Sequence, residues 1–198
     1  MDKKSFVNKV PKHLRSGRTR LSQWVGRTIL KISGWKIEGS IPNEERILIV
    51  AAPHTSNWDF VLGMATILGL NAKIKWIGKH SLFKPGLKWF FYWLGGIPVN
   101  REDPSTFIED VSIMVKKDKG LIIGMAPEGT RKKAEKWKSG FLRIAALTKS
   151  KILLLSIDSP SKTLLLGNFF EPTGDRNLDL RSVKEYYQSF KGINPSQS

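Results

Sequence analysis

The chain has 198 residues, with 33 Lys and Arg against 17 Asp and Glu, a formal net charge of +16 and a sequence pI near 10.1. It contains no cysteine, which excludes disulfides, thiolate nucleophiles and cysteine-bound metals. So large a positive charge predicts an anionic partner or substrate: nucleic acid, anionic lipid headgroups or a phosphorylated molecule.

Length and hydropathy narrow the class of protein further. A chain of this size can bury the core of one α/β domain, and no linker-like stretch divides it. No apolar run reaches the roughly 18 to 20 residues of a membrane-spanning helix, and the N-terminus lacks the apolar segment of a secretory signal. The three histidines, His13, His54 and His80, are far apart in sequence, so no metal site is expected. We expect a cytoplasmic protein.

Residues 1–36 form a basic segment with ten Lys or Arg and a single acid, Asp2. On a helical projection one face is mostly apolar, and cations line one flank of it. The apolar face comprises Leu21, Trp24, Val25, Thr28, Ile29 and Ile32, and the flank comprises Arg20, Arg27 and Lys31. Such a helix is typical of one lying in a membrane interface. The same pattern also fits a helix that packs its apolar face on the core, and both interpretations stay open.

From residue 46 onward, segments typical of strands and of helices alternate. Short apolar or alternating runs predict strands, and runs with helical spacing predict helices. The expected strands span residues 46–50, 72–77, 97–100, 121–125, 151–157 and 163–170. The expected helices span residues 60–70, 107–117, 138–149 and 178–190, and the polar residues after 191 are expected to fray. This order predicts an α/β fold: a single domain with a mixed, largely parallel sheet flanked by helices, preceded by an N-terminal amphipathic helix.

The densest aromatic stretch of the chain lies between residues 79 and 94. It holds more apolar side chains than one helix normally buries in so small a domain, and Lys79, Lys84 and Lys88 are interleaved with them. The stretch can contact lipid, form the wall of an apolar pocket or belong to the core. The sequence leaves all three open.

The segment 51–60 contains the first candidate for chemistry. His54 follows the strand predicted at 46–50, and Ser56 is suited to cap a helix that has Asp59 in its first turn. On an ideal helix, two side chains five positions apart point in directions that differ by about 140°. His54 and Asp59 can therefore meet only if His54 lies in the loop. In one interpretation Asp59 caps the helix and His54 is an ordinary loop residue. In the other, Asp59 orients His54, which acts as a general base on a hydroxyl.

Two further motifs follow predicted strands. Gly95-x-Ile-Pro-Val-Asn-Arg101 places an arginine near the end of the strand at 97–100. Pro127-Glu-Gly-Thr-Arg131 follows the strand at 121–125. The carboxyl ends of strands are the usual place for ligand-binding groups in open α/β sheets.

Taken in order and spacing, these two motifs and His54-x4-Asp59 resemble the motifs of the glycerolipid acyltransferases. The run Lys79-x-x-Leu-Phe-x-Pro85 is similar to the segment that this family has between its first two motifs. The resemblance covers roughly residues 45–160. The chain departs from the family pattern at Pro53, where Asn is frequent, at Ala126, where Phe is usual, and in the strand at 151–157, which lacks proline.

The resemblance implies roles for particular residues. His54 would be the general base and Asp59 its orienting partner. A second set would bind the headgroup of the acceptor, with positive charge placed near its phosphate. This acceptor-binding set comprises Arg101, Glu128, Gly129, Thr130 and Arg131, with Lys79 as a further cation.

The implied activity is transfer of a fatty acyl group from acyl-CoA or acyl-carrier protein to the hydroxyl of a lysophospholipid. The first acceptor to consider is 1-acylglycerol-3-phosphate, and other lyso-lipids are alternatives; no cofactor is implied beyond the acyl donor. Residues 1–36 would be a basic amphipathic segment and residues 37–198 the acyltransferase domain, bound peripherally to the anionic inner face of the membrane. A nucleic-acid-binding module is the alternative from another class, although no helix-turn-helix, RNP or zinc motif accompanies the charge.

Overall fold

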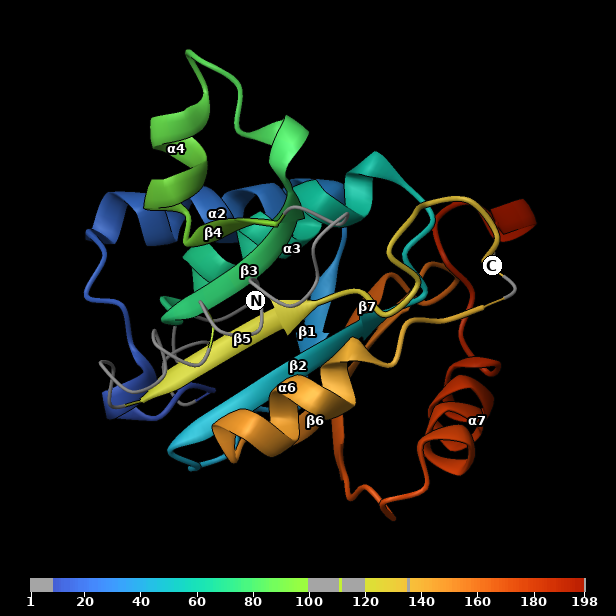
Figure 1. Ribbon diagram of the computed structural model, residues 1–198. Coiled ribbons are helices and arrows are strands. Elements are labelled where there is room, and N and C mark those ends of the chain that lie inside the picture. Colours follow the sequence, from blue (N-terminus) through green and yellow to red (C-terminus); the bar gives the residue numbers. More distant parts are fainter. Residues whose placement is uncertain (1–8, 100–110, 112–119, 135, 198) are drawn as a thin grey trace.

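The computed structural model describes residues 9–99, 111, 120–134 and 136–197. In this part of the chain one seven-stranded sheet has the strand order β1-β7-β6-β2-β5-β3-β4 (Figure 1). The strands are β1 (Lys36–Glu38), β2 (Arg46–Ala52), β3 (Ile74–Lys79), β4 (Gly96–Val99), β5 (Leu121–Met125), β6 (Lys151–Asp158) and β7 (Thr163–Phe170). The described pairings are parallel except β6 with β7. The mixed, largely parallel sheet predicted from the sequence is therefore confirmed.

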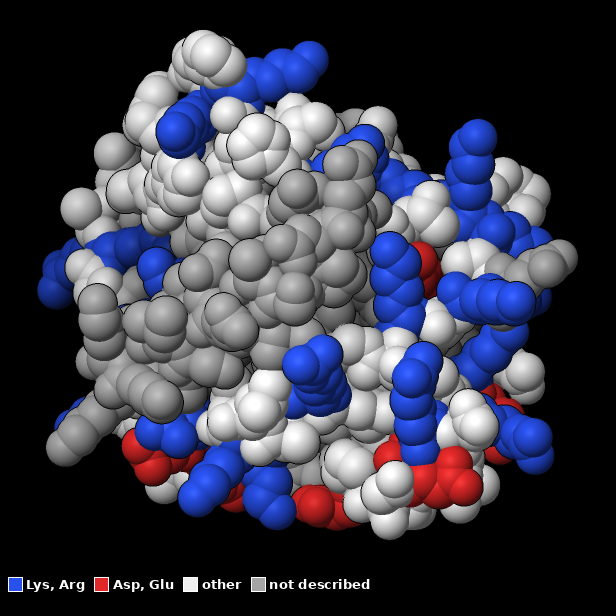
Figure 2. Space-filling model, viewed as in Figure 1, with Lys and Arg blue, Asp and Glu red and all other residues white. Residues whose placement is uncertain are grey.

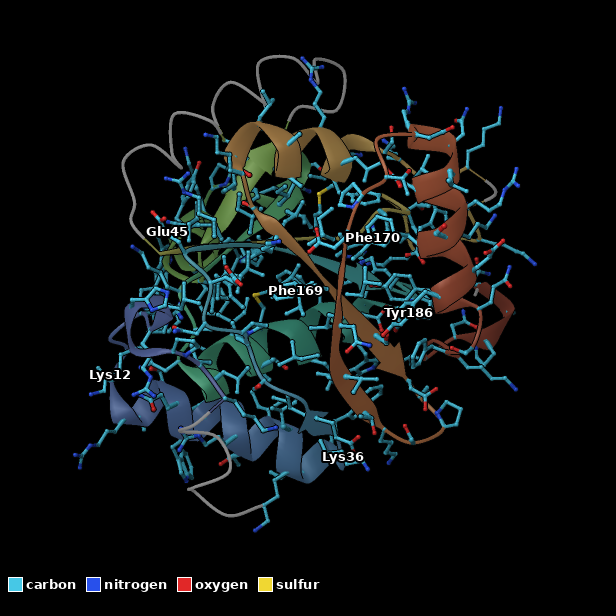
Figure 3. The ribbon with its side chains drawn as sticks, turned by 90° about the horizontal axis from the view of Figure 1, so that it is seen from below. Lys12, Lys36, Glu45, Phe169, Phe170 and Tyr186 are labelled. Carbon is cyan, nitrogen blue, oxygen red and sulfur yellow. The ribbon has the colours of Figure 1, made fainter. Side chains whose placement is uncertain are left out.

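Helices cover both faces of this sheet, as the view in Figure 3 shows. They are α2 (Arg20–Ser33), α3 (Asn57–Leu70), α4 (Lys88–Trp93), α6 (Gly140–Thr148) and α7 (Arg176–Tyr187), with short 3₁₀ turns at Lys12–Leu14, His80–Leu82 and Pro195–Gln197. Side chains of the central strand β2 alternate between two apolar cores: Ile47 and Ile49 pack on the side of α2 and α3, whereas Leu48 and Val50 pack on the side of α6 and α7. Its almost continuous apolar sequence follows from burial on both faces.

The N-terminal helix α2 packs on α3 through the face that holds Gly26 and Leu30. A Cβ at Gly26 would lie 2.5 Å from the carbonyl oxygen of Ala65, so only glycine allows the two backbones to approach this closely. Leu30 is fully buried, and Arg27, expected on the cationic flank, instead donates a hydrogen bond through Nε to Gly69 O at 3.0 Å. Gly34, with φ of 75°, ends the helix.

The apolar face predicted for this helix points away from the core. Trp24 is 61% exposed and Ile32 is 82% exposed, and Leu21 and Val25 are exposed beside them. The interpretation that this face packs on the domain core therefore holds only for Ile29, which is half-buried against the core, because Gly26 and Leu30 make the main contact. An exposed patch of large apolar side chains is left on the surface of α2.

The aromatic stretch at 79–94 is partly core, partly cavity wall and partly exposed. Phe83 is buried in the core, and Leu82 lines a cavity described below. Most of α4 is exposed, with Trp89 at 70%. The guanidinium of Arg18, just before α2, lies 5.8 Å from the ring centroid of Trp93, which brings α4 next to the start of α2.

Several expected elements differ in detail. The strand expected at 72–77 begins and ends two residues later, at Ile74–Lys79, and the three-residue strand β1 was not predicted at all. Apart from Val111, which is buried in the core, the helix expected at 107–117 lies outside the described residues. No helix in the described ranges combines the length and hydropathy that a bilayer crossing requires.

Candidate active site

His54 lies in the loop that joins the central strand β2 to helix α3. The chain leaves β2 through a cis Ala52–Pro53 peptide bond, and α3 begins at Asn57 with Ser56 as its N-cap. The Ser56 hydroxyl oxygen accepts a hydrogen bond from Trp58 N at 3.1 Å, while Asp59, at the third helical position, completes a capping box. His54 therefore lies in the loop and Asp59 lies in the first turn of α3. Contact between the two side chains requires this arrangement.

Asp59 both caps the helix and contacts the imidazole. Its Oδ2 accepts hydrogen bonds from the backbone N–H groups of Thr55 and Ser56, each at 2.7 Å, and lies 3.2 Å from His54 Nδ1. The Asp59 side chain is 1% exposed, and that of His54 is 21% exposed. Because a carboxylate only accepts, Nδ1 carries the proton that faces Asp59, which leaves Nε2 as the basic nitrogen.

Glu128, from the motif Pro127-Glu-Gly-Thr-Arg131, contacts the loop that contains His54. It lies in the turn after β5, where Gly129 has a φ of 65° and its N–H donates to Ala126 O at 3.3 Å. Glu128 Oε2 accepts a hydrogen bond of 2.7 Å from the backbone N–H of His54. Burial raises the pKa of Glu128 to about 7, against the opposing effect of that hydrogen bond. Glu128 therefore positions the histidine loop, a contact that the sequence did not predict.

A cavity of about 650 Å³ opens beside His54. Besides His54, it is lined by one apolar group of residues and one cationic group. The apolar lining comprises Phe60, Trp76, Ile77, Leu82, Val99, Met125 and Ile144, and the cationic lining comprises Lys79, Arg131, Lys132 and Lys138. A ligand with a hydrocarbon chain and an anionic group therefore matches this lining.

Aromatic rings in and behind the apolar lining pack against one another. Trp76 meets Phe60 edge to face at a centroid distance of 5.0 Å and stacks on Phe83 at 5.8 Å. Glycines make room for these rings, since a Cβ at Gly78 would lie 2.6 Å from the Trp76 ring and one at Gly96 would lie 2.8 Å from the Phe83 ring. A side chain at either glycine would push the aromatic rings out of place.

The structure brings most of the predicted site residues to this one cavity. His54, Lys79, Gly129, Thr130 and Arg131 line it. Asp59 contacts the imidazole of His54, and Glu128 accepts a hydrogen bond from the backbone N–H of His54. Arg101 lies outside the described residues. Within the described ranges, no group of three or more His, Cys, Asp or Glu side chains could hold a metal ion.

The C-terminal segment also reaches the site, so the expectation that it frays is wrong. The N–H of Asn194 donates to Thr55 Oγ1 at 3.0 Å, directly next to His54. Gln197 Oε1 accepts from the N–H of Lys133 at 3.0 Å, in the loop that follows Arg131. The segment thus links the histidine loop to the cationic loop. Its polar sequence, with only Ile193 as an apolar anchor, gave no signal of this role.

The match to a protein family covers all of these motifs. A family model described as Acyltransferase matches residues 35–158, which is more than half of the chain. The chain belongs to the acyltransferase family. The resemblance found from the motifs alone is therefore confirmed, and the longer described elements outside the match are α2, β7 and α7.

This acyltransferase-family chain is similar to one named protein in sequence and to one solved structure in fold. The 1-acyl-sn-glycerol-3-phosphate acyltransferase of Streptococcus pneumoniae is 29% identical over 165 residues, which cover 76% of this chain and 60% of that protein. The chain therefore spans 60% of the length of this relative. The crystal structure of the 1-acyl-sn-glycerophosphate acyltransferase from Thermotoga maritima matches with a TM-score of 0.59 and 22% identity over 86% of this chain and 78% of that chain. This likeness shows a shared fold.

Proposed function

We propose that this protein transfers a fatty acyl group from a thioester donor to the free hydroxyl of a lysophospholipid. One observation carries the proposal: His54 Nδ1 lies 3.2 Å from Asp59 Oδ2 beside a cavity with an apolar and a cationic lining. Membership of the acyltransferase family supports it. The names of the two relatives favour 1-acylglycerol-3-phosphate as the acceptor. No observation favours the nucleic-acid-binding alternative.

The proposed chemistry is a direct transfer in which His54 moves one proton. Nε2 removes the proton from the acceptor hydroxyl as its oxygen attacks the thioester carbonyl. The tetrahedral intermediate then collapses, the carbon–sulfur bond breaks, and the imidazolium returns the proton to the leaving thiolate. Asp59 stabilises the imidazolium between these steps, because its carboxylate faces Nδ1. The chain has no cysteine that could hold the acyl group covalently.

The two linings of the cavity suit different parts of the substrates. The acyl chain would lie against the rings of Phe60 and Trp76, which offer apolar surface next to the histidine. The acceptor phosphate would lie near Arg131, with Lys79 and Thr130 on the same cavity. Arg131 Nε is buried and has no hydrogen-bond partner among the described residues, so it has capacity to bind a ligand. Arg101 stays a prediction in this set.

A panel of acceptors tests the proposal directly. Purified protein would be incubated with 1-acylglycerol-3-phosphate, lysophosphatidylcholine and an amino-acid-derived lyso-lipid, each with acyl-CoA and with acyl-carrier protein. We expect diacyl product from 1-acylglycerol-3-phosphate, whose terminal phosphate is free, detected by mass spectrometry. Product from the amino-acid-derived lyso-lipid alone, which has no phosphate, would overturn the assignment of the cationic lining to a phosphate.

Arg131→Ala is expected to weaken binding of the acceptor more than binding of the acyl donor. A hydrogen bond to a charged group contributes about 1.5–3 kcal/mol, which corresponds to a loss of roughly 10- to 100-fold in kcat/KM for the acceptor. Steady-state kinetics that vary one substrate at a time would measure this effect. Lys133→Ala is a matched control, because it also removes one positive charge from this loop, and Lys133 does not line the cavity. An effect confined to the KM of the donor would move Arg131 to the thioester side.

The proposal extends to docking on the anionic inner face of a membrane, where both lipid substrates reside. Exposed apolar side chains are present on both α2 and α4, and the contact between Arg18 and the ring of Trp93 places α4 next to the start of α2 (Figure 1). Cations accompany the patch, since Arg20 and Lys31 are exposed on α2. Each Lys or Arg near an anionic leaflet contributes about 1 kcal/mol to the free energy of membrane binding. Insertion of apolar side chains adds a contribution to binding that salt does not screen.

A double variant on α2, Trp24→Ser with Ile32→Ser, is expected to release the protein from vesicles. Loss of these two side chains should cost at least about 2 kcal/mol, or roughly a 30-fold lower partition coefficient, without unfolding the exposed face. Co-sedimentation with neutral and with anionic vesicles would measure it. Leu178→Ser, an exposed apolar residue on α7, is the control. Equal binding by the double variant and the wild type would exclude α2 as the docking element.

A further inference from the structure

A second, smaller cavity lies between helix α7 and the loop that precedes α6. Its volume is about 380 Å³, and it is lined by Lys136, Trp137, Leu180, Arg181 and Lys184. Three of these five side chains are cations, one is an indole and one is aliphatic. In the view of Figure 2, several Lys and Arg side chains lie on the right-hand side of the molecule, with Asp and Glu among them at the lower right, and Figure 1 shows α7 and this loop on that side. The cavity therefore combines positive charge with apolar surface.

One stretch of chain contributes to the lining of both cavities. Lys136 and Trp137 line the second cavity, and the next residue, Lys138, lines the first. The N–H of Lys138 donates to Pro127 O at 2.8 Å, which holds the loop beside the turn that contains Glu128. A ligand that fills both cavities would pass over Lys138.

The indole in the second cavity is held in a fixed position relative to the histidine. The ring of Trp137 lies 5.7 Å from the ring of Tyr187, which is buried in the core. The Tyr187 hydroxyl donates to Val50 O at 2.6 Å, on the strand that leads to His54. Residues 180, 181 and 184 lie outside the family match at 35–158, so the cavity joins a family loop to an element beyond it.

We propose that the second cavity binds the nucleotide end of a CoA thioester. Lys136, Arg181 and Lys184 would face its phosphates, and the adenine ring would lie against Trp137 and Leu180. The pantetheine arm would then pass Lys138 and present the thioester to His54 in the first cavity. An indole within a hollow suits a planar base, which a carrier protein does not offer. This inference rests on the acyl transfer proposed above and specifies the donor.

Truncating the donor tests the inference. The variant Arg181→Glu, Lys184→Glu would be assayed with an acyl-CoA and with the matching acyl-pantetheine, which has the same thioester but no nucleotide. We expect the KM for acyl-CoA to rise at least about tenfold, because charge-assisted contacts are lost, and the KM for acyl-pantetheine to stay within about twofold. Arg143→Glu, an exposed charge reversal on α6 that lines neither cavity, is the matched control.

Other outcomes overturn the inference without touching the proposed function. Transfer that the double variant leaves unchanged, or weakens equally with both donors, would exclude a nucleotide site here. A rise in KM confined to acyl-carrier protein would make this surface a docking site for that protein instead.

Binding measurements keep the test independent of activity. Calorimetry with CoA, dephospho-CoA and pantetheine should show CoA binding at least about tenfold more tightly than pantetheine to the wild type, with that preference lost in the double variant. Equal affinity for CoA and pantetheine would overturn the inference even if no acyl transfer were detected. Absence of transfer from every donor, with CoA bound as expected, would instead count against the proposed function.

Discussion

His54→Ala is expected to abolish acyl transfer and to leave the protein folded. Removing a general base typically costs 10²- to 10⁴-fold in rate, and here the same imidazole must also protonate the leaving thiolate. The side chain is 21% exposed and contacts Asp59 at its Nδ1, whereas the hydrogen bond to Glu128 comes from the backbone N–H and survives the substitution. Thiol release under single-turnover conditions measures the rate, and thermal unfolding measures stability.

His13→Ala serves as the control for this prediction. His13 hydrogen-bonds Glu44 O at 3.0 Å, just before the start of β2, whereas His54 follows its end. A seven-residue strand separates the two histidines by roughly 23 Å, so this variant should keep full activity. Near-full turnover by His54→Ala would exclude the proton transfer proposed for it.

The sequence predicted the parts of the fold that depend on local pattern. The strand 46–50 was predicted because a strand buried on both faces is a continuous apolar run, and β2 is the strand between the two cores. The strand β1 was missed because it has three residues, of which only Ile37 is buried. Its position depends on pairing with β7, where Lys36 lies opposite Thr163, and no local pattern reports a partner so distant in sequence.

The same limit applies to the site. His54 and Asp59 were found because they lie five residues apart in a strand–loop–helix pattern. The hydrogen bond between His54 and Glu128 spans 74 residues, and the one between Thr55 and Asn194 spans 139 residues. The outward direction of Trp24 on α2 was also undecided, since helical periodicity identifies an apolar face without identifying what covers it. Such long-range contacts required the tertiary structure.

Asp59→Asn is expected to lower kcat by about 10²- to 10⁴-fold while the histidine loop keeps its shape. In the wild type, Oδ2 accepts from Thr55 N and Ser56 N and faces His54 Nδ1, whereas Oδ1 is buried without a partner among the described residues. An asparagine can therefore keep its oxygen at the Oδ2 position and place its amide at the Oδ1 position. The hydrogen bonds survive, and the negative charge that stabilises the imidazolium is lost.

Comparison with Asp59→Ala separates capping from catalysis. The Asp59→Ala variant loses both hydrogen bonds from the N–H groups of Thr55 and Ser56. This variant should therefore unfold at a clearly lower temperature than the wild type. Asparagine should lose less stability, about 1–3 kcal/mol for its buried amide group without a partner. We therefore expect two variants with similarly low kcat and different melting temperatures. If Asp59→Asn instead keeps kcat within about threefold of the wild type, the carboxylate only caps α3, and His54 acts without a charged partner.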